Sequence, residues 1–248
     1  MSADSNGTPG NEVTSYSVDE RGVALLRLER PKARNAMNTQ LLEELLGHLA
    51  AAREDEAVRV LVVSSSDHLG LSAGADVREQ LDADAHVSRM QLFSDLYDAV
   101  VAFPKPTIAA CHGDVVGGGA EIAVACDMRV GGANLRMRFP GAALGMPVGP
   151  ARLVTLCGLA AAKYLLLSSR TVGADEALRL GLVNRVAPAA ATEDSALALA
   201  AEIAAFPPEA VTRLKRMLHE WDDVVGRSAA EGRGQVEHVR SGENLPFG

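Results

Sequence analysis

A run of three glycines is the feature that most constrains the fold of this chain. Gly117, Gly118 and Gly119 stand between two apolar stretches, residues 107–111 and 122–126. The first stretch predicts a buried strand and the second predicts the beginning of a buried helix. Glycines at such a junction remove every side chain, so a ligand can contact bare backbone N–H groups at a helix N-terminus. The run therefore predicts either a binding corner or an ordinary glycine-rich loop.

Glu121 lies two residues after this run, in the first turn of the predicted helix. The helix dipole favours an ionised carboxylate at that place. A carboxylate beside a ligand can act as a general base or acid. The alternative interpretation of Glu121 is a solvated residue that only helps to start the helix.

The composition limits the class of protein. The chain has 248 residues, of which 48% are hydrophobic and 23% are charged, and this is ordinary for a soluble globular protein. The net charge of -8 argues against nucleic acid as a partner, because phosphate binding needs clustered Lys and Arg. We see no signal peptide and no uninterrupted apolar run long enough to span a bilayer. We therefore expect a cytoplasmic protein without a membrane partner.

The cysteines and histidines do not predict a metal site. Cys111, Cys126 and Cys157 are widely spaced, and two of them lie in apolar runs, which indicates buried free thiols. The six histidines do not have the spacing of zinc ligands. A phosphate-binding loop, a dinucleotide-binding fingerprint and a nucleophile elbow are also missing from the sequence. We therefore expect no metal and none of these three kinds of site.

The order of strand and helix patterns predicts the domain organisation. Residues 1–13 are rich in small and polar residues and predict a disordered tail. Residues 16–28 predict a β-hairpin, and residues 57–64 predict a strand buried on both faces. Strands alternate with helices to about residue 190, and the rest of the chain has helical patterns only. The expected fold is α/β, with a core over residues 14–190 and a helical region over residues 191–248.

A second segment of small residues, residues 70–76, also follows a predicted strand. Asp76 at its end could cap a helix, with Glu79 completing a capping box, and Asn38 could cap an earlier leucine-rich helix. The two small-residue segments lie in separate strand–helix units. If neighbouring strands bring them together, the N–H groups around Ala73 and Gly118 can point at one oxygen. That arrangement would be an oxyanion hole built from backbone.

Five stretches, in order along the chain, resemble the enoyl-CoA hydratase/isomerase family, also called the crotonase family. They read Glu-Arg-Pro-Lys-Ala-Arg-Asn-Ala-Met at 29–37, Ser-Ala-Gly-Ala-Asp at 72–76, Gly-Gly-Gly-Ala-Glu at 117–121, Cys-Asp-Met-Arg at 126–129, and Ala-Asp-Glu-Ala at 174–177 with Gly-Leu-Val at 181–183. The resemblance extends from about residue 16 to the end of the chain. The combination is specific, although each stretch alone is a weak signal.

The resemblance implies a fold and a type of chemistry. The fold would be a spiral of ββα units with a helical C-terminal trimerisation region, assembled as a homotrimer or a dimer of trimers. The substrate would be an acyl-CoA thioester, as in fatty acid metabolism, and it would react through an enolate held in the oxyanion hole. CoA would be part of the substrate, so no separate cofactor is expected.

The resemblance also implies roles for particular residues. The N–H groups of Ala73 and Gly118 would form the oxyanion hole, and Glu121 would be the catalytic acid or base. The loop at residues 32–36 would meet the CoA adenine and phosphates, although it could also be only an exposed turn. The implied substrate- and CoA-binding residues are Lys32, Ala33, Arg34, Ala36, Ala73, Gly74, Ala75, Asp76, Val77, Gly117, Gly118 and Gly141.

The sequence departs from the hydratase pattern at three places. Gly141 stands where the second hydratase glutamate is expected, the loop over residues 145–152 is shorter, and the usual last helix of the family is missing. One carboxylate can still perform single-base chemistry, and a water could occupy the space at Gly141. The reaction could therefore be hydration, isomerisation or decarboxylation, or the chain could be a weakly active or inert acyl-CoA-binding paralogue. Arg136 and Arg138 could hold a substrate carboxylate or could be solvated strand residues.

Overall fold

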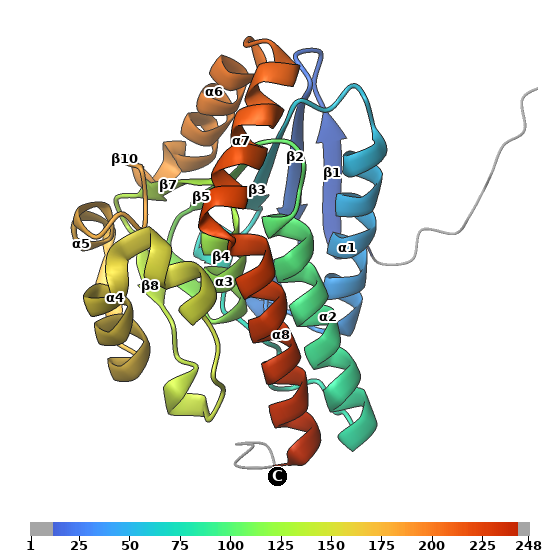
Figure 1. The fold of residues 1–248 in the computed structure, drawn as a ribbon, viewed down its shortest axis with the longest axis vertical. Coiled ribbons are helices and arrows are strands. Elements are labelled where there is room, and N and C mark those ends of the chain that lie inside the picture. Colours follow the sequence, from blue (N-terminus) through green and yellow to red (C-terminus); the bar gives the residue numbers. More distant parts are fainter. Residues whose placement is uncertain (1–11, 243–248) are drawn as a thin grey trace, which may run out of the picture.

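Two sheets form the frame of the molecule, as Figure 1 shows. The computed structural model describes residues 12–242. The larger sheet has the strand order β1-β2-β3-β5-β7-β10, and the smaller sheet has the order β4-β6-β8-β9. The strands of the larger sheet are β1 (Thr14–Val18), β2 (Val23–Leu28), β3 (Val60–Ser65), β5 (Thr107–Cys111), β7 (Met128–Gly132) and β10 (Arg185–Ala187). Those of the smaller sheet are β4 (Gly70–Ser72), β6 (Asp114–Val116), β8 (Arg136–Arg138) and β9 (Thr171–Gly173).

The chain winds between the two sheets in repeated ββα units. The units are β3-β4-α2, β5-β6-α3 and β7-β8-α4, and in each the first strand joins the larger sheet and the second joins the smaller sheet. Their helices are α2 (Ala83–Val101), α3 (Gly118–Ala125) and α4 (Pro150–Ser168). The parallel pairs β3–β5, β5–β7, β4–β6 and β6–β8 place equivalent strand ends at the same edge. This arrangement confirms the predicted spiral of ββα units.

Several local predictions are confirmed. Strands β1 and β2 form the expected antiparallel hairpin, and all six residues of β3 are buried, as a strand covered on both faces requires. Helix α1 (Thr39–Glu54) begins after Asn38, whose side chain accepts a hydrogen bond from the Leu41 N–H at 3.1 Å. The leucine stripe of α1, which includes Leu45, faces the core.

The predicted cap at Asp76 is wrong. Helix α2 begins after Asp82, whose side chain accepts a hydrogen bond from the Ala85 N–H at 2.9 Å. Asp76 is buried and forms an ion pair with Arg30 at 3.0 Å, and it also accepts a hydrogen bond from the Arg78 N–H. The sequence pattern at Asp76 therefore indicated a tight turn that precedes the helix by several residues.

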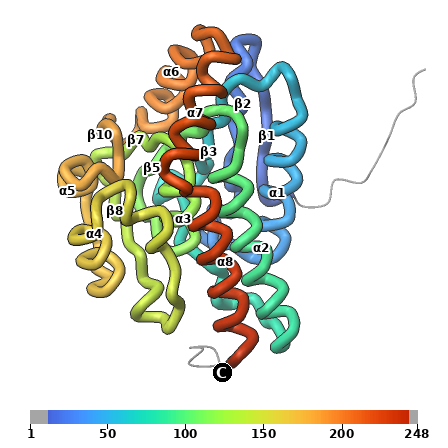
Figure 2. The backbone as a smooth tube through the Cα atoms, in the orientation of Figure 1, coloured from blue at the N-terminus to red at the C-terminus, as the bar shows by residue number. Residues whose placement is uncertain are grey.

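The C-terminal third of the described chain is mostly helical. It contains α5 (Ala174–Arg179), α6 (Thr192–Ala204), α7 (Pro208–Asp222) and α8 (Val224–Ser241). Along the whole described chain, short 3₁₀ turns lie at Pro31–Ala33, Ala142–Leu144 and Ala189–Ala191. The alanines of α6 pack on Val60, Ile108 and Val130 of the larger sheet. Helix α8 lies alongside α2, which Figure 2 shows in red and green. Most of the predicted tail, residues 1–11, lies outside the described residues, but the Val13 N–H donates to Glu44 Oε2 at 2.9 Å.

Helix α4 is long and apolar enough, by length and composition, to cross a bilayer, although Arg152 and Lys163 interrupt its apolar sequence. Only 22% of its apolar window is buried inside the protomer. A single helix of this kind is weak support for a membrane span. Gly158 has non-helical backbone angles and divides α4 into two pieces, each shorter than the about 20 residues that a span needs.

Candidate functional site

The two segments of small residues lie side by side, as predicted. Strand β4 pairs with β6 in parallel, so the residues after Ser72 and the residues after Val116 leave the same edge of the smaller sheet. Gly74 has a φ of +93°, and a Cβ atom there would lie 2.9 Å from the Val116 carbonyl oxygen and 3.5 Å from the Gly118 nitrogen. Only glycine allows this approach of the two backbones.

A cavity of about 340 Å³ opens between these segments, α2, α8 and the loop after β8. This volume is at the lower end for sites that bind small organic ligands. The predicted site residues that line it are Ala73, Gly74, Ala75, Val77, Gly117, Gly118, Glu121 and Gly141. Further lining residues are His86, Arg89, Met90, Phe93, Tyr97, Val116, Arg138, Pro140, Ala143, Leu144, Met146, Val148, Gln235 and Val239. The cavity is therefore mainly apolar with a few polar groups.

Glu121 is a buried cavity residue and not a solvated helix starter. It lies in the first turn of α3 and is 1% exposed. Its Oε2 accepts hydrogen bonds from Arg152, at 2.8 Å from Nη2 and 3.1 Å from Nε. Its Oε1 has no hydrogen-bond partner among the described residues. One oxygen of the carboxylate is thus held, and the other is buried without a partner.

Burial raises the pKa of Glu121 above its ordinary range, and this effect outweighs the opposite effect of Arg152. The nearby Glu231 carboxylate also raises the pKa of Glu121. Burial likewise raises the pKa of Tyr97, so this phenol stays protonated beside the carboxylate. A carboxylate with a raised pKa is a better proton acceptor near neutral pH than an ordinary glutamate.

The predicted role of the Ala73 amide in the oxyanion hole is contradicted. The Ala73 N–H donates to the Arg34 carbonyl oxygen at 2.9 Å, so it is not free to bind a ligand. Ala75, two residues after Ala73, forms a parallel β-bridge with Met37. The Met37 N–H donates to the Gly74 carbonyl oxygen, and the Met37 carbonyl oxygen accepts from the Asp76 N–H. In this pattern the Ala75 N–H points away from Met37. Within residues 12–242, neither the Ala75 N–H nor the Gly118 N–H has a hydrogen-bond partner.

On the side where Gly141 would carry a Cβ atom, the space is occupied by the following loop. A Cβ atom on Gly141 would lie 2.5 Å from the Met146 carbonyl oxygen and 2.9 Å from Val148 Cγ1. The shortened loop therefore folds back over Gly141 and fills this space with its own atoms. Among the residues that line the cavity, Glu121 is the only carboxylate.

The predicted CoA loop lies outside the cavity. Lys32 is exposed, Ala33 and Ala36 are half-buried, and Arg34 forms ion pairs with Asp67 at 3.2 Å and Asp114 at 3.1 Å. The two arginines of β8 differ. Arg136 is exposed and pairs with Asp114, whereas Arg138 lines the cavity and donates from Nε to the Ser169 carbonyl oxygen.

Sequence reasoning missed the residues around Glu121 that come from distant helices. Arg152 lies in α4, Tyr97 in α2, and Glu231 and Gln235 in α8. The one signal in the sequence is that Arg152 interrupts an otherwise uncharged stretch, residues 141–162. Within the described part of the chain, no group of three or more His, Cys, Asp or Glu side chains is placed to hold a metal ion.

Solved structures with a similar fold include enoyl-CoA hydratases and isomerases. An enoyl-CoA hydratase/isomerase from Xanthobacter autotrophicus Py2 superposes with a TM-score of 0.85 at 27% identity, over 95% of this chain and 89% of that chain. An enoyl-CoA isomerase from M. smegmatis gives a TM-score of 0.75 at 28% identity, over 86% of this chain and 95% of that chain. These similarities identify the class of the fold, the crotonase fold.

Sequence comparison agrees with the structural comparison. A model of the family described as enoyl-CoA hydratase/isomerase matches residues 19–237. The 2,3-dehydroadipyl-CoA hydratase of Escherichia coli K12 is 35% identical over 208 residues, which cover 83% of this chain and 81% of the relative. The mouse enoyl-CoA hydratase domain-containing protein 2, mitochondrial, is 37% identical over 96% of this chain and 82% of its own length. The chain belongs to the enoyl-CoA hydratase/isomerase family, whose members act on acyl-CoA thioesters.

Proposed function

We propose that this protein moves a proton at the α-carbon of an enoyl-CoA thioester, with Glu121 as its single acid and base. The observation that carries the proposal is the buried Oε1 of Glu121, which has no partner among the described residues, in the only carboxylate among the residues that line the cavity. Migration of the double bond from the 3- to the 2-position needs one base that removes a proton and returns it at another carbon. The site therefore suits isomerisation better than the addition of water.

The steps of this reaction balance on Glu121 alone. The ionised Oε1 takes the proton from C2 of a 3-enoyl thioester, and the electron pair moves onto the thioester carbonyl to give a dienolate. The protonated Glu121 then returns the same proton to C4, and the conjugated 2-enoyl thioester forms. Hydration would require a bound water and a second group to exchange its protons, and the lining of the cavity supplies no second carboxylate.

The oxyanion hole in this proposal consists of the Ala75 and Gly118 N–H groups. Both residues line the cavity, and neither amide has a partner among the described residues. The Gly118 N–H also lies at the N-terminus of α3, where the helix dipole favours negative charge. Two such donors stabilise the thioester oxygen as it becomes negative in the dienolate.

The CoA nucleotide and the assembly complete the proposal. The exposed Lys32 can meet a phosphate, whereas the charge of Arg34 is already paired with Asp67 and Asp114.

The exposed apolar side chains of α4 and α7 would pack between subunits of a homotrimer or a dimer of trimers. They include Leu159, Tyr164, Leu167, Leu214, Leu218 and Trp221.

Hydration is the second candidate function. The Escherichia coli relative, 35% identical, is named 2,3-dehydroadipyl-CoA hydratase, and a Clostridium acetobutylicum relative, 32% identical, is named short-chain-enoyl-CoA hydratase. A weakly active or inert acyl-CoA binder is the third. The experiment below separates the three.

The test follows the absorbance of the conjugated enoyl thioester. Wild-type protein is given a 3-enoyl-CoA in one reaction and crotonyl-CoA in another. An isomerase raises the absorbance in the first reaction, and a hydratase lowers it in the second. Glu121→Gln should lower the isomerisation rate by about 10²- to 10⁴-fold, and the exposed Glu220→Gln serves as the control. CoA-ester binding without a change in either reaction would reject the enzyme and support the binder.

A further inference from the structure

We infer that Glu231 of α8 is a positioning residue for Glu121 and acts on it through Arg152. The inference rests on the proposed function of Glu121 as the catalytic acid and base. Glu231 does not line the cavity, so it would influence the reaction without touching the substrate.

Arg152 joins the two carboxylates through a single nitrogen. Its Nη2 lies 2.8 Å from Glu121 Oε2 and 2.6 Å from Glu231 Oε1. Its Nη1 donates to the Ser228 hydroxyl of α8 at 3.0 Å, and its guanidinium lies 4.9 Å from the centre of the Tyr97 ring. The side chains of Arg152 and Glu121 are 2% exposed and that of Glu231 is 10% exposed. Solvent therefore screens these charges little.

Glu231 also fixes the beginning of the helix that carries Arg152. Its Oε1 accepts a hydrogen bond from the Gly149 N–H at 3.0 Å, and its Oε2 accepts one from the Ala151 N–H at 2.7 Å. Gly149 lies beside the unpaired oxygen of Glu121, since a Cβ atom there would lie 2.8 Å from Glu121 Oε1. The α8 carboxylate thus holds in place both the cation that binds Oε2 and the backbone beside Oε1.

The sharing of Arg152 sets the electrostatic balance at Glu121. Two ionised carboxylates face one guanidinium, so one negative charge of the trio is not compensated. The other ionisable groups around the trio are Tyr97 and Asp98 on α2, and Arg233 on α8, which acts on Asp98. If Glu121 had Arg152 to itself, its ionised form would be more stable and it would be a weaker base. Because the Glu231 carboxylate pairs with the same guanidinium, it weakens the stabilisation of ionised Glu121 and makes Glu121 a stronger base.

A purely structural role for Glu231 predicts something different. As a cap of α4 alone, Glu231 would affect the stability of the fold and the amount of active protein. It would not change the pH at which Glu121 titrates. The two interpretations therefore differ in the titration of one carboxyl group.

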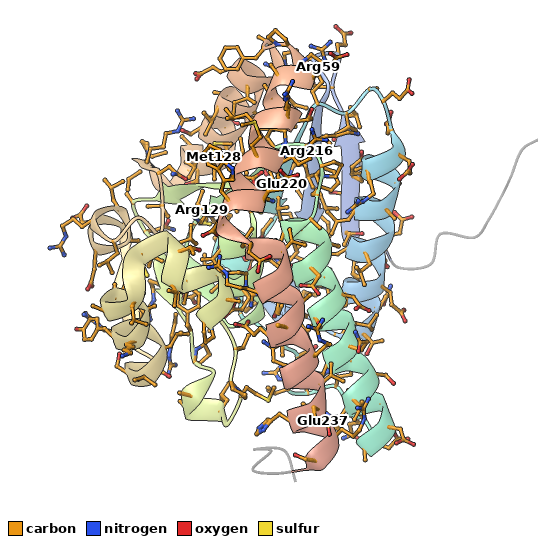
Figure 3. The ribbon with its side chains drawn as sticks, viewed as in Figure 1. Arg59, Met128, Arg129, Arg216, Glu220 and Glu237 are labelled. Atoms are coloured by element: carbon orange, nitrogen blue, oxygen red, sulfur yellow. The ribbon has the colours of Figure 1, made fainter. Side chains whose placement is uncertain are left out.

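The experiment measures that titration directly, by ¹³C NMR of protein labelled at the glutamate carboxyl carbons. The Glu121 resonance is assigned by its loss in Glu121→Gln. In Glu231→Gln, Glu121 should titrate at lower pH than in the wild type, because a neighbouring negative charge is removed while Arg152 remains. The matched control is Glu237→Gln, the same change at an exposed site on α8, which Figure 3 labels near the C-terminal end of that helix. It should leave the titration of Glu121 unchanged.

A second measurement needs no change to the trio. In wild-type protein, the titration curve of Glu121 should deviate from that of a single independent group, because its carboxylate interacts with a second one through Arg152. Unchanged titration of Glu121 in Glu231→Gln, or a wild-type titration curve of Glu121 that fits one independent group, would overturn the inference. Neither readout requires turnover, so a failure of the proposed isomerisation would be seen separately. If turnover is present, the decline of kcat on the acid side should occur at a lower pH in Glu231→Gln than in the wild type. KM should stay within about twofold of the wild type.

Discussion

Arg152 on α4 holds Oε2 of Glu121 on α3 at 2.8 Å and leaves Oε1 without a partner. The two residues are 31 positions apart in the sequence, and both side chains are almost fully buried. An ion pair in such a place normally holds a carboxylate in its ionised form. Here burial and the Glu231 carboxylate oppose that effect and raise the pKa of Glu121.

The first prediction concerns the pH dependence of the reaction. Glu121 must be ionised to take a proton, and burial raises its pKa. As the pH falls, kcat/KM should therefore decline at a pH above the range of an ordinary glutamate. The measurement is the rate of isomerisation of a 3-enoyl-CoA as a function of pH. A decline at or below the ordinary glutamate range would contradict the raised pKa.

The second prediction separates the two candidate amides of the oxyanion hole. Replacement of Ala75 by lactic acid turns its N–H donor into an ester oxygen and should lower kcat by about 10²- to 10³-fold. The same replacement at Ala73 removes only the hydrogen bond to Arg34 and should cost about 1 kcal/mol of stability with little change in kcat. Both are measured by steady-state kinetics and urea denaturation. A large loss of kcat with the replacement at Ala73, and little change with that at Ala75, would show that Ala73 is the donor.

The third prediction concerns Gly141, the position at which the family resemblance implies a second glutamate in hydratases. Gly141→Glu should not create hydratase activity, and it should destabilise the fold by about 1–3 kcal/mol, because its Cβ would collide with the Met146 carbonyl. Gly47→Glu is the control, since a Cβ there has no neighbour within 4 Å. Thermal unfolding and crotonyl-CoA hydration are the measurements. A stable Gly141→Glu protein that hydrates crotonyl-CoA would show that the loop over Gly141 yields easily.

The fourth prediction concerns stability and pH. Arg152→Met leaves two buried carboxylates without their cation and should cost about 3–5 kcal/mol at neutral pH. Without Arg152, burial and Glu231 raise the folded-state pKa of Glu121 further above its unfolded value. Stability is then lost as the pH rises from the unfolded pKa to the folded pKa, so the deficit should be smaller in acid.

Urea denaturation at about pH 4 and about pH 7 checks this expectation. The matched control is Arg216→Met, a change at an exposed side chain of α7 that Figure 3 labels. It should alter the free energy of unfolding by at most about 0.5 kcal/mol. An Arg152→Met deficit that is equal at both pH values would argue against the ionised carboxylates as its cause.

The fifth prediction concerns assembly. Trp221 is 80% exposed in the protomer, and Leu214 and Leu218 are exposed on the same helix at helical spacing. If this face packs against another copy of the chain, Trp221→Asp should shift the protein to smaller species in analytical ultracentrifugation. Arg213→Asp introduces the same side chain on α7 at a charged position and is the comparison. Wild-type protein that sediments as a monomer would reject the proposed trimer.

The sequence predicted much of the fold because short-range patterns decide it. Alternating strand and helix signals indicated the α/β core, and Asn38 and the hairpin before Leu28 were identified from local chemistry. The cap at Asp76 was misjudged, because a tight turn and a helix start use the same side-chain chemistry. Only the paired register of neighbouring strands shows which amides remain free, and this moved the proposed oxyanion donor from Ala73 to Ala75.

The sequence by itself determined the family, the glycine corner at Gly118 and the position of Glu121 beside it. These features are local, because they are read from residue types within short stretches of the sequence. The tertiary structure alone decided what surrounds the acid. Arg152 and Glu231 reach Glu121 from helices that pack together only after the chain has folded. Their effect on its charge depends on distance and burial, which residue order does not specify.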